Sequence, residues 1–139
     1  MIQLIVGNAG KGKTGAMLEK VNREIKEAKG DIVYIDKNSK HMYELNNKIR
    51  LVDMSEYGFA ASDEFYGFIC GILSQNHDIE QLYFDGFKKI CNVDNDNLEA
   101  VLNKFAALSE KKGIIFTISL TMDKSEVPDS YKENIIVAL

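Results

Sequence analysis

A glycine-rich segment near the N-terminus has the residue types and spacing of a loop that binds phosphate. Residues 7–14 read Gly-Asn-Ala-Gly-Lys-Gly-Lys-Thr and fill every fixed position of the pattern G-x-x-x-x-G-K-[ST]. Gly7 and Gly12 allow the backbone to turn tightly, so that successive N–H groups can surround an anion. Lys13 would reach the β- and γ-phosphates of a nucleotide, and the Thr14 hydroxyl would ligate the Mg²⁺ between them.

The segments on either side of the loop favour the same interpretation. The apolar run Ile2–Val6 before it fits a buried parallel strand. After it, apolar residues at helical spacing form one face of a helix: Leu18, Val21, Ile25 and Ala28. This helix is predicted to end at Lys29–Gly30 with a C-cap glycine, and the positive end of its dipole would point at the phosphate. The residues expected to contact the nucleotide are Gly7, Asn8, Ala9, Gly10, Lys11, Gly12, Lys13, Thr14 and Gly15.

In this strand-loop-helix setting, Gly7–Thr14 resembles the Walker A loop of the P-loop nucleoside triphosphatases. The resemblance implies that superfamily's fold and a cofactor, Mg²⁺, bound together with the nucleotide. The segment Gln81–Asp85 resembles the Walker B element, an apolar strand that ends in an aspartate. The resemblance therefore implies that Asp85 and Thr14 hold the metal ion. A structural alternative is that Asp85 simply starts a turn with Gly86.

The resemblance to the RecA-like branch, which includes some small bacterial ATPases of this size, implies one more residue. In that branch, the strand after Walker B ends in a polar side chain that senses the γ-phosphate. This strand lies between the strand before the phosphate loop and the Walker B strand. Ser119 matches the position in this sequence, with Thr117 or Thr121 as alternatives if the strand boundary differs.

Length and composition argue against several classes of protein. The 139 residues suffice for a single domain, residues 1–139, and the net charge of -4 argues against a general nucleic-acid binder. Cys70 and Cys91 lack the spacing of a zinc site. The sequence shows no leader segment, and its longest apolar run is too short to span a bilayer. We therefore expect a cytoplasmic protein that does not enter a membrane.

The rest of the chain alternates between strand and helix patterns. Strands are expected at 31–36, 49–54, 114–119 and 135–138, with 49–54 at an edge. Helices are expected after Ser39, from Ser62 as N-cap, and from Asp94 or Asp96 to Gly113. Gly67 and Gly71 would let the second main helix lie close to the sheet. The pattern predicts a three-layer α/β/α domain with a mostly parallel sheet of five to six strands.

Three classes of function fit these features. The first is an ATPase that is slow or depends on a partner, either another copy of the chain or a different protein. Its catalytic residues would be Lys13 and Asp36, because the position after Asp85, where a catalytic glutamate commonly stands, is Gly86. Asp36 is equally well explained as a turn residue. The second class is a nucleotide-dependent switch or scaffold, and the least favoured is a small-molecule kinase. ATP is the expected nucleotide, because no Asn-Lys-x-Asp motif supports guanine.

Overall fold

The computed structural model describes all of residues 1–139 and has a six-stranded sheet in which all neighbouring strands are parallel. The strands are β1 (Ile2–Gly7), β2 (Asp31–Asp36), β3 (Arg50–Asp53), β4 (Ile79–Phe84), β5 (Ile115–Thr121) and β6 (Ile135–Ala138). Their order across the sheet is β3-β2-β4-β5-β1-β6. The strand β5 therefore lies between β1 and β4, and β3 is an edge strand, as expected from the sequence.

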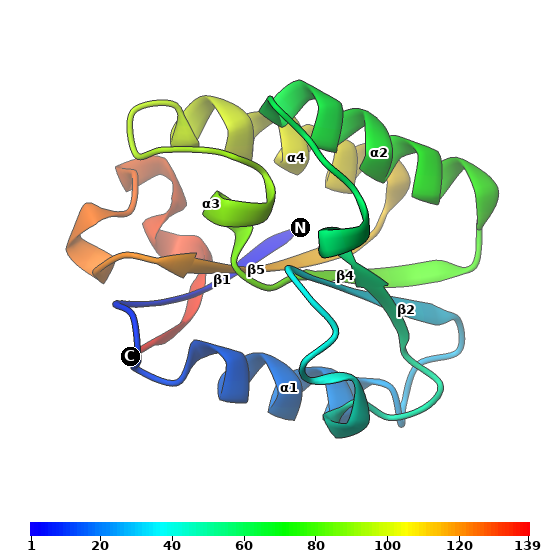
Figure 1. The fold of residues 1–139 in the computed structure, drawn as a ribbon. Helices are drawn as coiled ribbons and strands as arrows, with labels where there is room; N and C mark the ends of the chain where they lie inside the picture. Colours follow the sequence, from blue (N-terminus) through cyan, green and yellow to red (C-terminus); the bar gives the residue numbers. More distant parts are fainter.

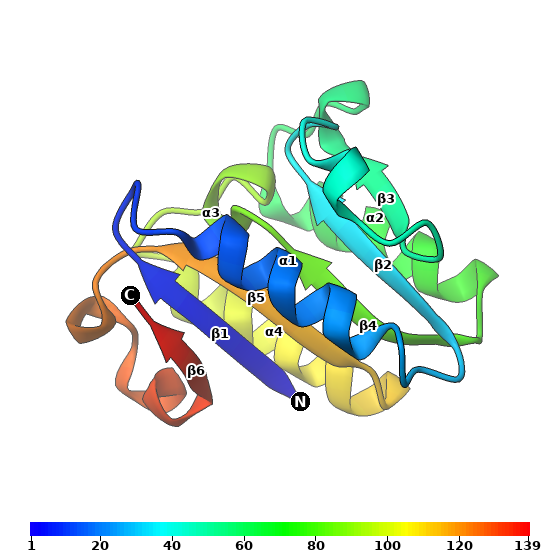
Figure 2. The ribbon, with the colours of Figure 1, turned by 90° about the horizontal axis from the view of Figure 1, so that it is seen from below.

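Helices cover both faces of this sheet. Helix α1 (Lys13–Glu24) lies on one face, and α2 (Ser62–Gln75), α3 (Phe87–Ile90) and α4 (Leu98–Lys112) lie on the other (Figures 1 and 2). Short 3₁₀ turns complete the connections, at Met42–Glu44, Met54–Glu56, Lys124–Glu126 and Asp129–Asn134. The structure confirms the predicted α/β arrangement with a sheet between two helical layers. No helix is long and apolar enough to cross a bilayer.

The larger of the two hydrophobic cores fixes β4 in place. It contains 27 buried residues between the sheet and the layer of α2, α3 and α4. The ring of Phe84, at the end of β4, lies 5.4 to 6.1 Å from four other phenylalanine rings: Phe65, Phe87, Phe105 and Phe116. These edge-to-face contacts anchor the backbone immediately before Asp85.

The period of two along each strand decides which way the polar strand ends face. Tyr34 and Tyr83 both belong to the smaller core, which packs against α1. Their rings stack with centroids 5.9 Å apart. Asp36 and Asp85 each follow two residues later and so lie on the same side of the sheet. The strands thus bring both carboxylates to the α1 face.

Several local predictions were wrong. Helix α1 ends at Glu24 rather than at Lys29, and Gly30 is not a C-cap in the left-handed region. A Cβ on Gly30 would lie 2.1 Å from the carbonyl oxygen of Asp78, so glycine is required there by a close backbone approach. Gly67 and Gly71 lie on the exposed side of α2, where an added Cβ would meet nothing within 4 Å.

Two helix starts also differ from expectation. Helix α2 has Ala61 at its N-cap, and Ser62 is its first helical residue. The N-cap of α4 is Asn97, and Asp94 instead accepts hydrogen bonds from the backbone N–H groups of Asp96 and Asn97, at 3.0 and 3.1 Å. Gly113 does end α4 in the left-handed region, with φ of 66°. After Ser39 there is only the single 3₁₀ turn at Met42–Glu44.

Gly30→Ala should destabilise the protein by about 1–3 kcal/mol, because the new methyl group would overlap the Asp78 carbonyl. Gly67→Ala is the matched control. It adds the same methyl group to an open helix surface and should stabilise the fold by about 0.5–1 kcal/mol. Urea unfolding measures both changes, and a Gly30→Ala protein as stable as the natural one would contradict the close approach.

Candidate functional site

The segment between β1 and α1 has a backbone shape that glycine makes possible. Gly10 and Gly12 have φ values of 80° and 100°, in the left-handed region that L side chains rarely adopt. Gly7 is a different case, because its φ is not in this region. A Cβ there would lie 3.1 Å from the Cβ of Leu139, so the close passage of this residue favours glycine.

The N-terminus of α1 presents backbone donors that the protein itself does not use. The first backbone hydrogen bond of the helix is from Ala16 N–H to Gly12 O, at 3.1 Å. The N–H groups of Gly12, Lys13, Thr14 and Gly15 donate to no acceptor within the protein. No acidic side chain occupies the first turn of the helix. These N–H groups and the helix dipole are therefore free to bind an anion.

Lys13 is held over the loop, whereas Lys11 is not. The Lys13 ammonium donates to the carbonyl oxygen of Asn8 at 3.2 Å. Burial lowers the pKa of Lys13, the negative charge of Asp85 opposes this shift, and the positive charge of Lys37 adds to it. Lys11 is exposed, and its side chain makes no hydrogen bond or ion pair. Of the two lysines in the loop, only Lys13 faces the carboxylates.

Three hydroxyl groups from three different elements meet at the carboxylate of Asp85. This side chain is buried, with 7% of its surface exposed. Its Oδ1 accepts from Thr14 Oγ1 at 3.4 Å and from Ser119 Oγ at 3.1 Å. Its Oδ2 accepts from Tyr34 Oη at 2.9 Å. The structure thus brings together Thr14, Asp85 and Ser119, which the sequence had singled out separately.

The other two polar residues considered on β5, Thr117 and Thr121, do not reach Asp85. Thr117 donates to Gln3 Oε1 at 3.3 Å, and Thr121 is exposed at the end of β5. Among the three residues considered for this position, Ser119 is the one that reaches Asp85. Its Oγ also accepts a hydrogen bond of 2.7 Å from the backbone N–H of Gly86. Ser119 therefore fixes both the carboxylate and the turn that follows it.

Tyr34 is a site residue that the sequence analysis missed. Burial and the charge of Asp85 raise the pKa of Tyr34, so its hydroxyl remains a hydrogen-bond donor. The signal was present in the alternation along β2, because Tyr34 and Asp36 lie two residues apart on one face. An aromatic residue in a buried strand is, however, usually explained by packing alone.

Asp36 has a carboxylate oxygen without any partner. The side chain is 2% exposed, its Oδ1 accepts from the Lys37 backbone N–H at 2.7 Å, and its Oδ2 is buried and makes no hydrogen bond. Burial raises the pKa of Asp36, as does the negative charge of Asp85, while Lys37 and His41 oppose the shift. A buried unsatisfied acceptor costs free energy, so Asp36 is a candidate for a functional residue.

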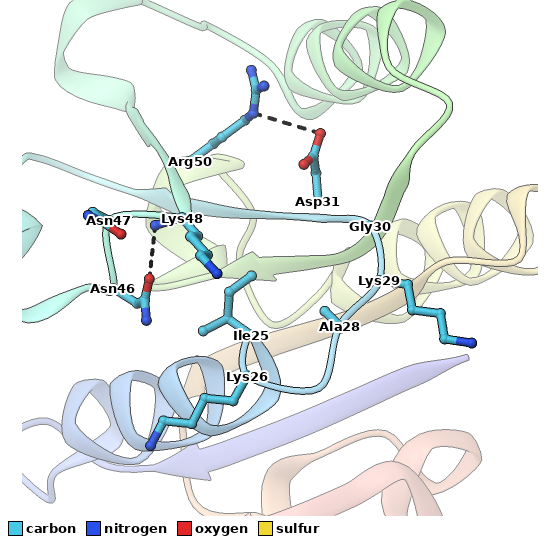
Figure 3. Close-up of a pocket in the computed structure, with 10 residues that line it drawn as sticks. All are labelled: Ile25, Lys26, Ala28, Lys29, Gly30, Asp31, Asn46, Asn47, Lys48 and Arg50. Carbon is cyan, nitrogen blue, oxygen red and sulfur yellow. Dashed lines mark hydrogen bonds and ion pairs between the residues drawn. The ribbon is translucent and has the colours of Figure 1, made fainter.

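One large hollow of the molecule lies away from these residues. It has a volume of about 820 Å³ and lies at the opposite edge of the sheet, between the end of α1 and the start of β3. Lys26, Lys29 and Arg50 line it, but their side chains point away from one another (Figure 3). Lys26 and Lys29 are exposed and follow Glu24, the last residue of α1, so nothing in this hollow gathers their charges around a ligand.

Comparisons with known proteins add no assignment: no model of a protein family matches the chain, and no curated protein sequence matches it. The site therefore has to be interpreted from its own geometry.

The raised pKa of Asp36 predicts how the stability of the protein depends on pH. Because the folded protein holds this proton more tightly than the unfolded chain, Asp36 adds stability at low pH that is lost as pH rises through its raised pKa. We expect the free energy of unfolding of the natural protein, minus that of Asp36→Asn, to fall as pH rises above about 4, the ordinary value for an aspartate. Its slope cannot exceed about 1.4 kcal/mol per pH unit. Urea unfolding at several pH values tests this, and a difference that rises with pH would contradict the raised pKa.

Proposed function

We propose that this protein binds a nucleoside triphosphate, with ATP favoured, together with Mg²⁺, and hydrolyses it slowly unless a partner completes the site. The observation that carries the proposal is the row of unused N–H groups from Gly12 to Gly15, with Lys13 beside them and Asp85 behind. The resemblance of Gly7–Thr14 to the Walker A loop supports it, as does the position of β5 between β4 and β1.

The side chains of Thr14 and Asp85 have the chemistry that the expected metal ion needs. Mg²⁺ prefers oxygen ligands and is commonly bound through one or two protein oxygens together with substrate phosphates and water. Thr14 Oγ1 and Asp85 Oδ1 lie 3.4 Å apart and supply a hydroxyl and a carboxylate. When bound there, Mg²⁺ would offset negative charge on the phosphates. No group of three His, Cys, Asp or Glu side chains suited to a metal ion occurs in the structure, so the proposed ion would depend on one carboxylate, one hydroxyl and the phosphates.

The chain's own residues then have distinct roles. The loop N–H groups and the Lys13 ammonium bind phosphate oxygens. Ser119 and Tyr34 hold the Asp85 carboxylate in one orientation through their hydroxyl groups. Asp36, with its raised pKa and unpaired Oδ2, is the chain's candidate to accept a proton from an attacking water.

Both arginines lie at the end of the sheet opposite the phosphate loop, so neither can complete the site. Arg23 is exposed in the last turn of α1, at the opposite end from the loop. Arg50 is at the start of β3, where its nearest acid is Asp31 at 3.9 Å. An arginine placed on the γ-phosphate accelerates related reactions by about 10³ to 10⁵. The missing arginine and Gly86 after Asp85 favour slow hydrolysis, and they equally favour a switch that signals through its bound nucleotide.

Lys13→Ala should weaken the binding of Mg-ATP by about 10- to 100-fold, because a charge-assisted contact with phosphate is lost. Lys11→Ala is the matched control, since it removes the same charge from the same loop but from an exposed side chain. It should change the affinity by no more than about threefold. Isothermal titration calorimetry measures both, and equal losses would mean that the loop is wrongly interpreted.

The purified protein should release phosphate from ATP at less than roughly 1 s⁻¹, below the usual range of enzymes. Steady-state assays over a wide range of protein concentrations test this. A rate per molecule that rises with concentration would indicate that a second copy contributes to the site. A faster rate that does not depend on concentration would show that the chain already holds a full catalytic set.

A further inference from the structure

A second hollow, of about 310 Å³, lies at the same edge of the sheet as Asp36 and Asp85. Its walls come from the ends of β2 and β3, from the loop before α2 and from α3, through Lys37, Met54, Tyr57, Phe59, Lys89 and Ile90. In the strand order, β3 and β2 come first, then β4, β5 and β1. Asp36 ends β2, and Lys37, the next residue, lines the hollow.

The charged part of the hollow is basic and unpaired. Lys37 and Lys89 are both exposed, and neither takes part in any of the six ion pairs of the structure. No acidic residue lines the hollow. Lys37 directly follows Asp36 at the end of β2, so the hollow adjoins the strand end that carries this carboxylate. Two unopposed positive charges in a chain of net charge -4 favour an anion at this place.

The other wall is apolar and held in place. Phe59 packs against Phe65 and Phe68, with ring centroids 5.9 and 5.3 Å away. The ring of Tyr57 lies 5.1 Å from that of Phe68, yet 48% of the Tyr57 surface is exposed. An aromatic ring that is fixed on one side and open on the other is a good surface for packing a flat molecule.

We propose that this hollow binds a small organic anion, with a ring packed against Tyr57 and a charged group placed between Lys37 and Lys89. Its volume is at the lower end of the range of about 300–1,000 Å³ found for ligand sites, which fits a molecule of one or two rings. The proposal goes beyond nucleotide binding and does not depend on it. If both proposals hold, the bound anion contacts Lys37, the residue directly after Asp36.

Titration of the ¹⁵N-labelled full chain with benzenesulfonate, followed by NMR, tests the proposal. The signals of Gly58 and Lys89 should shift and saturate. Sulfate, which has the charge without the ring, and benzyl alcohol, which has the ring without the charge, should each bind about tenfold more weakly or less. Benzyl alcohol binding as tightly as benzenesulfonate would overturn the proposal.

Matched variants locate the site. The double variant Lys37→Gln/Lys89→Gln should weaken benzenesulfonate binding about tenfold, and Tyr57→Ser should weaken it as well. The control Lys26→Gln/Lys48→Gln removes two lysines from the larger hollow and should change the affinity by less than about twofold. Equal losses in both double variants would show that only overall charge matters and would overturn the proposal.

The same spectra separate this proposal from nucleotide binding. Shifts confined to Gly10 and Gly12 would mean that the anion prefers the phosphate loop, which overturns the proposal for the hollow but not the proposed function. Shifts at Gly58 and Lys89 that persist in Lys13→Ala would support the hollow even if Mg-ATP fails to bind.

Discussion

The buried carboxylate of Asp85 needs hydrogen-bond donors, and the arrangement of the site follows from how the fold supplies them. A charge removed from water is costly unless polar groups surround it. Here the donors are Thr14 from α1, Ser119 from β5 and Tyr34 from β2, at 2.9 to 3.4 Å. All three can reach Asp85 because β4 lies between β2 and β5, and because β5 in turn pairs with β1, which leads into the loop. The strand order thus determines which side chains can donate to Asp85.

Asp36 differs from Asp85, although both are buried at adjacent strand ends. Asp85 has three hydroxyl partners, whereas Asp36 Oδ2 has none and the pKa of Asp36 is raised. An unsatisfied acceptor next to a second carboxylate weakens the fold, so a structural role alone explains it poorly. A ligand, a metal ion or a transferred proton at this edge would supply the missing partner. The N–H groups of the loop also lack partners, but they are donors and would be satisfied by an anion.

Much of the fold followed from local sequence patterns, because the apolar runs that lead to Asp36, Asp85 and Ser119 are typical of buried strands of a parallel sheet. The details that failed depend on tertiary contacts. Gly30 resembles a helix C-cap in the sequence, yet it is explained by the carbonyl of Asp78, 48 residues away along the chain. The role of Tyr34 and the unpaired oxygen of Asp36 depend on which strands become neighbours. The hollow beside Lys37 and Lys89 is formed by separate loops, and no local pattern predicts it.

The most direct test of the account is a crystal structure of the protein with Mg²⁺ and a non-hydrolysable ATP analogue. The account predicts that the phosphates accept hydrogen bonds from the N–H groups of residues 12–15 and contact the Lys13 ammonium, with the metal ion bound at Thr14 Oγ1 on the Asp85 side. An analogue bound at another surface, with this loop and the Asp85 hydrogen bonds unchanged from those described above, would contradict it.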